Sequence, residues 1–275
     1  MRPLSFITTF LCAAAILASC STIKEDRREC ETYLTVNVDD FIAAGFTEAT
    51  LSYRTDEGDF RRETFELAPY EGVGYEIAVR RGRSARASVI AGIGDGTLTD
   101  GALYAEQNCP FGRTWAFAGG TTPTGDTATI RATPSKQYCK VTFHFPEGTP
   151  DDAVFPYTLR VRASFNGFDI FDLSPEQTDY EICTYPDDEN GYSVILPRQA
   201  DYDIRLDVIL PGDGFQAPGQ VLYVIDLGKR FINAGYDWQK ENLDDIDVVV
   251  DFSRAAVEIV VKDWDEDDSY SDTEI

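Results

Sequence analysis

The stretch DIDVVVDFSRAAVEIVVKDW, residues 245–264, alternates apolar and charged side chains in two successive runs. A period of two places alternate side chains on opposite faces of a β-strand. The short segment SRA, residues 253–255, separates the runs and makes a tight connection. The stretch therefore predicts a β-hairpin with one apolar and one solvated face. The apolar face consists of Ile246, Val248, Val250 and Phe252 in the first strand and Val257, Ile259 and Val261 in the second.

The same period of two recurs along the chain from residue 33, where Leu34, Val36 and Val38 of YLTVNV share one face. Turn signals such as DEGD and GDG separate the runs, and GKRFINAGYDW, residues 228–238, is the one stretch that suggests a short helix or loop. This spacing predicts an all-β protein built as antiparallel sandwiches. Further strands are predicted at 49–54, 60–67, 73–80, 84–91, 113–118 and 127–132, and in YCKVTFHF, YTLRVRAS, GFDIFDL, YEICTY, YSVILP, DYDIRLDVIL and QVLYVIDL.

The segment ATPSK, residues 132–136, predicts a joint between two domains. Pro134 ends a strand, Ser135 and Lys136 are expected to be solvated, and the strand pattern restarts directly afterwards. We therefore expect an N-terminal β-sandwich over residues 33–133, a C-terminal β-sandwich over residues 134–264, and an acidic tail over residues 265–275.

The first thirty residues have a different character. A basic start precedes an apolar run from Leu4 to Leu17, which is too short for the ~20 residues that span a bilayer. The run ends in LASC, residues 17–20, which resembles the lipobox of bacterial lipoproteins. We expect residues 1–19 to be a signal peptide, Cys20 to be lipidated, and residues 20–32 to form a solvated tether. An ordinary signal peptide or an apolar N-terminal helix is the alternative.

The net charge of −24 bears on the partners. Nucleic-acid binding requires clustered Lys and Arg that release counterions from phosphates. The excess of 48 acidic over 24 basic residues argues against such binding. The charge also argues against electrostatic adhesion to an anionic membrane. Membrane contact is expected through the lipid, since each buried methylene contributes ~0.8 kcal/mol.

Six cysteines occur in the sequence, and four remain after Cys12 is removed with the signal and Cys20 is acylated. An even set in an exported chain can form two disulfides with three connectivities, and free thiols are the alternative. Their spacing does not match a zinc site. The four are Cys30, Cys109, Cys139 and Cys183.

The residues that carry catalysis are scarce. His144 is the single histidine and lies in a predicted strand, so a structural role is expected. AGIGDG, residues 91–96, lacks a following helix pattern and predicts a turn at a strand end. PDDENG, residues 186–191, lacks the spacing of a calcium loop and predicts a solvated loop. No carboxylate pair stands out among 48 acidic residues, so we expect no enzyme activity, cofactor or metal site.

Both ends of the chain resemble one family. The start, CSTIKEDRREC followed by LTVNV, and the segment DLGKRFINAGYDWQKENLDDIDVVVDFSRAAVEIVVKDW are similar to the fimbrillin-A-associated anchor proteins, the minor-fimbria anchor lipoproteins of Bacteroidales. Glu31 departs from this pattern, since proline is expected there. The resemblance implies two tandem transthyretin-like Greek-key sandwiches, an outer-membrane location, and a role in anchoring a fimbria by binding its basal stalk subunit.

Two other functions remain open. A surface lipoprotein that binds glycan would use an exposed row of aromatic side chains, and the sequence holds 14 Tyr and 17 Phe. A polymerising or tip subunit would be cleaved on maturation. The basic pairs that could be cleaved are Arg27-Arg28, Arg61-Arg62 and Arg80-Arg81.

The tail DEDDSYSDTEI, residues 265–275, is a poor donor strand because its carboxylates would enter an apolar groove. We therefore hypothesise that this subunit terminates a polymer and does not donate this segment. Deletion of residues 265–275 is expected to leave the number of cell-bound fimbriae unchanged, as counted by electron microscopy. A folded variant that loses its fimbriae would contradict the hypothesis.

Overall fold

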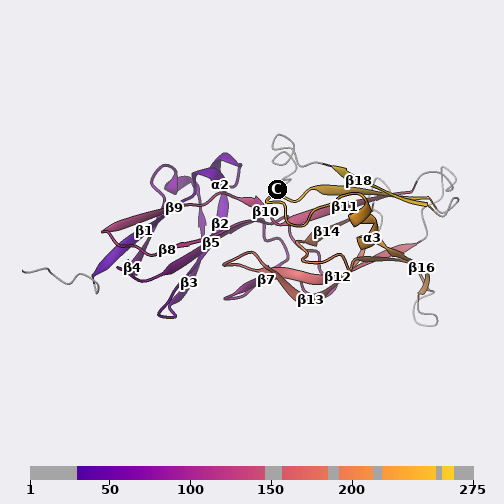
Figure 1. The fold of residues 1–275 in the computed structure, drawn as a ribbon, viewed down its shortest axis with the longest axis horizontal. Coiled ribbons are helices and arrows are strands. Elements are labelled where there is room, and N and C mark those ends of the chain that lie inside the picture. The colour runs from indigo at the N-terminus through magenta and orange to yellow at the C-terminus, as the bar shows by residue number, and fades with distance from the viewer. Residues whose placement is uncertain (1–29, 146–156, 185–191, 213–218, 252–255, 263–275) are drawn as a thin grey trace, which may run out of the picture.

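The computed structural model describes residues 30–145, 157–184, 192–212, 219–251 and 256–262. The regular structure of these residues is almost entirely β-strand, in four sheets arranged as an elongated molecule with two halves (Figure 1). The predicted all-β class is therefore confirmed. The sandwich architecture is also confirmed, whereas the transthyretin-like topology stays a prediction.

The first half contains two sheets. The three-stranded sheet has the order β4 (Tyr75–Arg80), β1 (Glu31–Asn37), β9 (Thr127–Arg131). The five-stranded sheet has the order β10 (Ser135–Lys136), β8 (Trp115–Thr121), β5 (Ala85–Ala91), β2 (Glu48–Thr55), β3 (Phe60–Glu66). The helix α2 (Asp39–Ala43), which the period-two pattern did not predict, follows β1, and a 3₁₀ turn, η1 (Ala68–Tyr70), follows β3.

The second half also contains two sheets. The four-stranded sheet has the order β14 (Tyr192–Pro197), β11 (Tyr138–His144), β17 (Asp245–Asp251), β18 (Ala256–Lys262). The six-stranded sheet consists of β16 (Gln220–Asp226), β15 (Arg205–Leu210), β12 (Thr158–Asp169), β7 (Ala102–Tyr104) and β6 (Thr97–Leu98), with β13 (Pro175–Thr184) paired to β12. The helix α3 (Leu227–Asn233) lies within the stretch predicted as helix or loop.

The predicted hairpin is confirmed, since β17 pairs with β18 in antiparallel register from Asp245↔Lys262 to Asp251↔Ala256. Its connection, residues 252–255, lies outside the described residues. The expectation of purely antiparallel sheets is wrong in two places, because β1 pairs with β9 and β11 pairs with β17 in parallel. In each half, the first strand thus lies between one antiparallel and one parallel neighbour. Alternation reports which face is apolar and carries no information on strand direction.

The sheets interleave across residue 133, where the sequence places the domain boundary. The strands β6 and β7 come from the first half of the sequence, yet β7 pairs with β12 of the second half. A Cβ at Gly167 would lie 2.0 Å from the Leu103 carbonyl oxygen, so only glycine permits this close pairing. Within β5, Val89 belongs to the core of the first half and Ile90 to the core of the second. The five-stranded sheet is therefore buried on both faces where the halves meet.

Ser135 and Lys136 of the predicted joint are buried, and the expectation that they are solvated is wrong. They form β10, which pairs with β8, and Lys136 is 1% exposed. The Lys136 Nζ donates a hydrogen bond to Asp245 Oδ1 at 2.7 Å and lies 4.7 Å from the centroid of the Tyr138 ring. The ammonium is thus satisfied by a carboxylate and an aromatic face inside the protein.

A second cation, the half-buried Arg198, contacts the same joint. The Arg198 guanidinium donates to Gln137 Oε1 at 2.8 Å, to the carbonyl oxygen of Lys136 in the joint, and to carbonyl oxygens of the segment 238–241 that follows α3. Burial lowers the pKa of Arg198. The carbonyls belong to Trp238 (2.6 Å), Lys240 (2.7 Å), Glu241 (2.9 Å) and Lys136 (3.3 Å).

The substitution Lys136→Met is expected to lower the free energy of unfolding by about 2 kcal/mol, because it removes the hydrogen bond and the aromatic contact that a buried ammonium makes inside the protein. The matched control is Lys262→Met on β18, where the lysine pairs with Asp247 but its side chain is 57% exposed. This change is expected to cost less than about 1 kcal/mol. Urea denaturation of both purified variants measures the difference. Equal losses of unfolding free energy in the two variants would show that the buried Lys136 ammonium does not stabilise the joint.

Candidate interaction surface

The cysteines proposed from the sequence do not meet as disulfides. Cys20 lies outside the described residues. In the structure Cys30, Cys109, Cys139 and Cys183 are free thiols, which is one of the two alternatives that the sequence left open. Cys139 is fully enclosed on β11, where burial raises the pKa of its thiol and disfavours the reactive thiolate. Cys183 lies on β13 and Cys30 is exposed.

The other candidates from the sequence lie apart from one another. His144 is at the end of β11, with its Nε2 3.5 Å from Asp247 Oδ1 and half of its side chain exposed. The strand-end turn in AGIGDG is confirmed, since β5 ends at Ala91 and Gly92 has a φ of +71°. PDDENG and the pair Arg27-Arg28 lie outside the described residues. Arg61-Arg62 lies on β3, and Arg80 ends β4.

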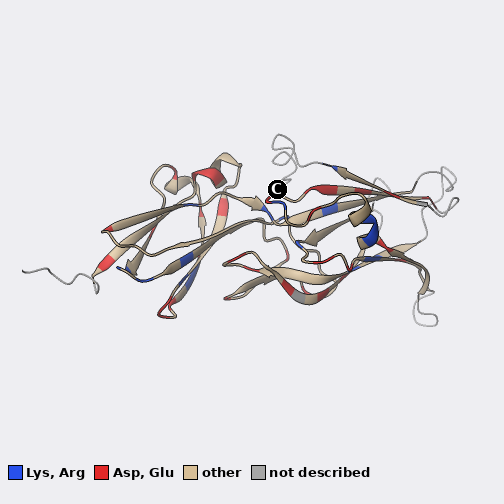
Figure 2. Cartoon of the chain, viewed as in Figure 1, with Lys and Arg blue, Asp and Glu red and all other residues tan. Residues whose placement is uncertain are grey.

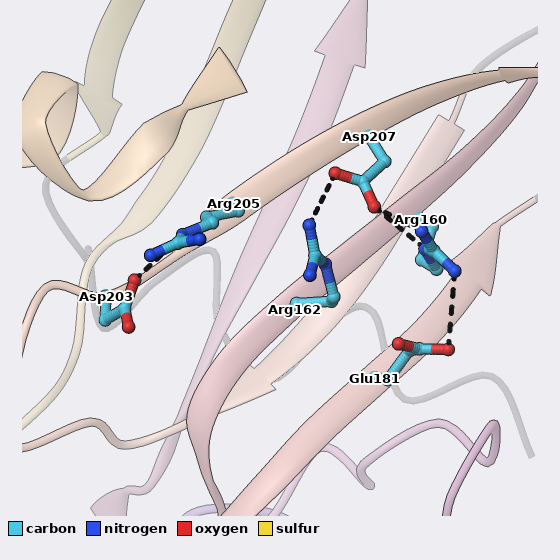
Figure 3. Close-up of polar contacts among 6 residues, drawn as sticks. All are labelled: Arg160, Arg162, Glu181, Asp203, Arg205 and Asp207. Carbon is cyan, nitrogen blue, oxygen red and sulfur yellow. Dashed lines mark hydrogen bonds and ion pairs between the residues drawn. The ribbon is translucent and has the colours of Figure 1, made fainter. Parts of the chain in front are cut away.

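One group of charged side chains gathers on the outer face of the six-stranded sheet (Figure 3). We call it the arginine–carboxylate cluster. Cross-strand register brings β12 beside β15, with Arg160 opposite Asp207 and Arg162 opposite Arg205. The cluster comprises Arg160, Arg162, Glu181, Asp203, Arg205 and Asp207.

Asp207 is the centre of the cluster. It is 1% exposed, although its neighbours Leu206 and Val208 point to the opposite, apolar face of β15. Arg160 donates to Asp207 Oδ2 from Nε at 2.9 Å and from Nη2 at 2.6 Å, while Arg162 Nη2 donates to Oδ1 at 2.8 Å. These bonds raise the pKa of the Arg160 guanidinium. The two arginine side chains therefore cover the carboxylate and satisfy both of its oxygens.

The two arginines that face one another across β12 and β15 would repel if left alone. Asp207 compensates Arg162, and Asp203 Oδ1 accepts from Arg205 Nε at 3.1 Å. The Nε of Arg162 is buried with no hydrogen-bond partner among the described residues. Arg162 and Arg205 line an open depression of about 290 Å³, together with Ser164, Asp179, Tyr180 and Glu181.

The depression provides charged hydrogen-bonding groups and lacks the arrangement of a catalytic centre. Tyr180 is enclosed, its hydroxyl donates to the Ile195 carbonyl oxygen at 3.0 Å, and burial raises its pKa. Ser164 lies on β12 in the six-stranded sheet, whereas the single histidine of the sequence lies on β11 in the four-stranded sheet.

Sequence reasoning missed this cluster, although a signal was present. The arginines of RVR in β12 and the charges of RLD in β15 occupy alternate positions, as outward side chains of a strand do. The sequence does not state that β12 and β15 are neighbours, and the burial of Asp207 follows only from that pairing.

No family model and no curated protein matches this sequence. Solved structures match its fold. The fimbrial anchor protein Mfa2 from Porphyromonas gingivalis has 12% identity and a TM-score of 0.56, with 85% of this chain and 97% of that chain covered. A proposed polysaccharide-binding protein from Bacteroides thetaiotaomicron has 15% identity, a TM-score of 0.54, and coverages of 86% and 97%. A proposed adhesin from Bacteroides ovatus has 12% identity, a TM-score of 0.54, and coverages of 90% and 97%.

At these identities the likeness establishes the fold. The resemblance to fimbrial anchor proteins is thus confirmed for the fold and stays a prediction for the family. Within the described part of the chain, no helix is long and apolar enough to cross a membrane.

The substitution Asp207→Asn is expected to destabilise the protein by about 2–3 kcal/mol, because an amide has one acceptor oxygen and its NH₂ would face an arginine donor. The control is Asp203→Asn, whose side chain is 61% exposed and whose loss is expected to cost at most about 0.5 kcal/mol. Thermal unfolding followed by circular dichroism compares the two. An Asp207→Asn protein as stable as the control would show that the cluster does not support the fold.

Proposed function

We propose that this protein is an outer-membrane lipoprotein that anchors a fimbria by binding its stalk subunit. The observation that carries the proposal is the fold shared with the fimbrial anchor protein Mfa2, which spans 85% of this chain and 97% of that one and so includes both halves. The N-terminal sequence supports it independently, because LASC at residues 17–20 has the features of a lipidation site.

The shape of the molecule suits this role. β1 begins at Glu31, eleven residues after Cys20, at one end of the long axis, and β16 lies at the other end (Figure 1). A tether of residues 20–30 extends at most ~3.5 Å per residue, so the β1 end would lie near the membrane. The six-stranded sheet would then present its β16 end away from the lipid, where a partner outside the membrane can reach it.

A non-enzymatic role fits the chemistry of the described surface. The arginine–carboxylate cluster holds its charged groups in mutual hydrogen bonds. We also propose that this subunit terminates the polymer and does not donate its acidic segment, residues 265–275. These residues lie outside the described part of the chain.

Glycan binding is the second candidate, favoured by the polar depression beside Arg162 and Arg205. Sugar rings are usually held by an exposed aromatic row. The exposed aromatic residues among those described are Tyr33 on β1 and Tyr223 on β16, which belong to different sheets. This separation makes fimbrial anchoring the better-supported function.

The substitution Cys20→Ala is expected to move the protein from the membrane fraction to the soluble fraction and to release fimbriae into the medium, because no acyl chain can then be attached. The matched control is Cys30→Ser, at the exposed cysteine before β1. It is expected to leave the protein in the membrane fraction and the fimbriae on the cells. Fractionation, fimbrial counts and the intact mass of the wild-type protein provide the measurements. A wild-type mass without acyl chains would refute the lipid anchor.

A further inference from the structure

The edge strand β16 is unlike the other sheet edges of the molecule. It pairs with β15 on one side and with no described strand on the other. An unpaired strand edge presents a row of backbone N–H and C=O groups that a further strand can satisfy. Soluble proteins usually block such edges with charged side chains, proline or short length.

The side chains of this edge are apolar and exposed. The large apolar residues exposed in the described part of the molecule number eight, and four of them lie on β15 and β16. Such clustering marks an interaction surface, because scattered single residues are what an ordinary surface shows. The four are Leu210 (41% exposed), Val221 (41%), Tyr223 (54%) and Val224 (59%).

Some of the other long edges carry charges. β3 has the run Arg61-Arg62-Glu63, β4 has Glu76 and Arg80, and β18 has Glu258 and Lys262. In β16, no charged residue occurs from Gln220 to Ile225 (Figure 2). The single charge, Asp226, accepts a hydrogen bond from the Lys229 backbone N–H at 2.9 Å and caps α3. The edge strands β14 (YSVILP) and β9 (TATI before Arg131) also lack charge, but four of the six side chains of β14 are buried and β9 exposes no large apolar side chain. Among the described sheet edges, β16 is therefore the uncharged one that exposes large apolar side chains.

The register of β15 and β16 shows which side chains an incoming strand would meet. Val224 is opposite Asp207 on the outer face, next to the arginine–carboxylate cluster, whereas Tyr223 is opposite Val208 on the core side. Val208 is fully buried, whereas Tyr223 beside it on β16 is more than half exposed. The face of the sheet that is covered by the core at β15 is therefore exposed to solvent at β16. An added strand would pair with the backbone of β16 and cover Val221 and Val224 with its own apolar side chains.

We propose that β16 is the docking edge for an extended apolar strand of the fimbrial stalk subunit, which adds to the six-stranded sheet of this protein. The inference rests on the proposed anchoring function and deepens it by naming the surface and the kind of segment it binds. Backbone hydrogen bonds would supply much of the affinity, and the alternate side chains the specificity.

The position and charge of the molecule favour a stalk strand over a second copy of this chain. β16 lies at the end of the long axis opposite the start of β1 (Figure 1). Two copies of a chain with a net charge of −24 repel one another, which disfavours edge-to-edge pairing between them. A strand from another subunit avoids this repulsion when it is apolar or basic.

The test uses the double variant Val221→Lys/Val224→Lys, which places two charges on an exposed edge without disturbing buried residues. The matched control is Val260→Lys on the β18 edge, where the valine is 46% exposed. Fimbriae sheared from cells that express the protein are the probe, and binding is measured by surface plasmon resonance. The double variant is expected to bind at least about tenfold more weakly than wild type, and the control within about twofold.

Hydrogen exchange on the wild-type protein gives a second readout that does not depend on any variant. Amides of residues 220–226 are expected to gain protection when fimbriae bind, whereas those of β18 are expected to stay unchanged. If wild type binds fimbriae, but the double variant binds equally well or β16 gains no protection, the docking edge is wrong while anchoring stands. If wild type does not bind fimbriae at all, the proposed function itself fails. Self-association through β16, detected by sedimentation of the wild type and lost in the double variant, would also overturn the inference.

Discussion

The Lys136–Asp245 contact is the interaction on which the arrangement of the two halves depends. Lys136 is at the last strand of one five-stranded sheet, and Asp245 begins β17 of the next sandwich, so a single 2.7 Å hydrogen bond joins them. A buried ammonium without a carboxylate would be strongly destabilising, and the pair therefore tolerates few alternative orientations. Arg198 adds carbonyl contacts at the same joint. The two sandwiches behave structurally as one elongated body.

A second contact between the halves reinforces that body. Phe171, which follows β12, is 1% exposed; its backbone oxygen accepts from Arg86 Nη2 at 2.8 Å, and the Arg54 guanidinium lies 4.4 Å from the centroid of its ring. With β7 also paired to β12, the six-stranded sheet is fastened to the first half at one end and unpaired at the other. Under the proposed anchoring function, such a body would transmit force between a membrane and a filament.

The six-stranded sheet combines two surfaces of opposite chemistry. Its centre carries the arginine–carboxylate cluster, where hydrogen bonds hold each charge in place, and its edge carries exposed valines. Charged groups engaged with one another contribute little free binding capacity, whereas an unpaired strand has both backbone groups and apolar area to offer. The β16 edge is therefore better suited to bind a partner than the cluster, although the cluster adjoins a depression of about 290 Å³.

The sequence alone indicated most of the longer strands, because a period of two is a local property that needs no knowledge of neighbours, but it missed the short strands β6, β7 and β10. It located the β17–β18 hairpin and the region of α3, and it placed His144 in a strand. Tertiary structure decided everything that depends on which strands lie side by side. This includes the parallel pairs β1–β9 and β11–β17, the burial of Lys136 beside Asp245, and the shielding of Asp207 by two arginines. It also decided that β16 is an edge, since alternation marks an apolar face but not whether another strand covers it.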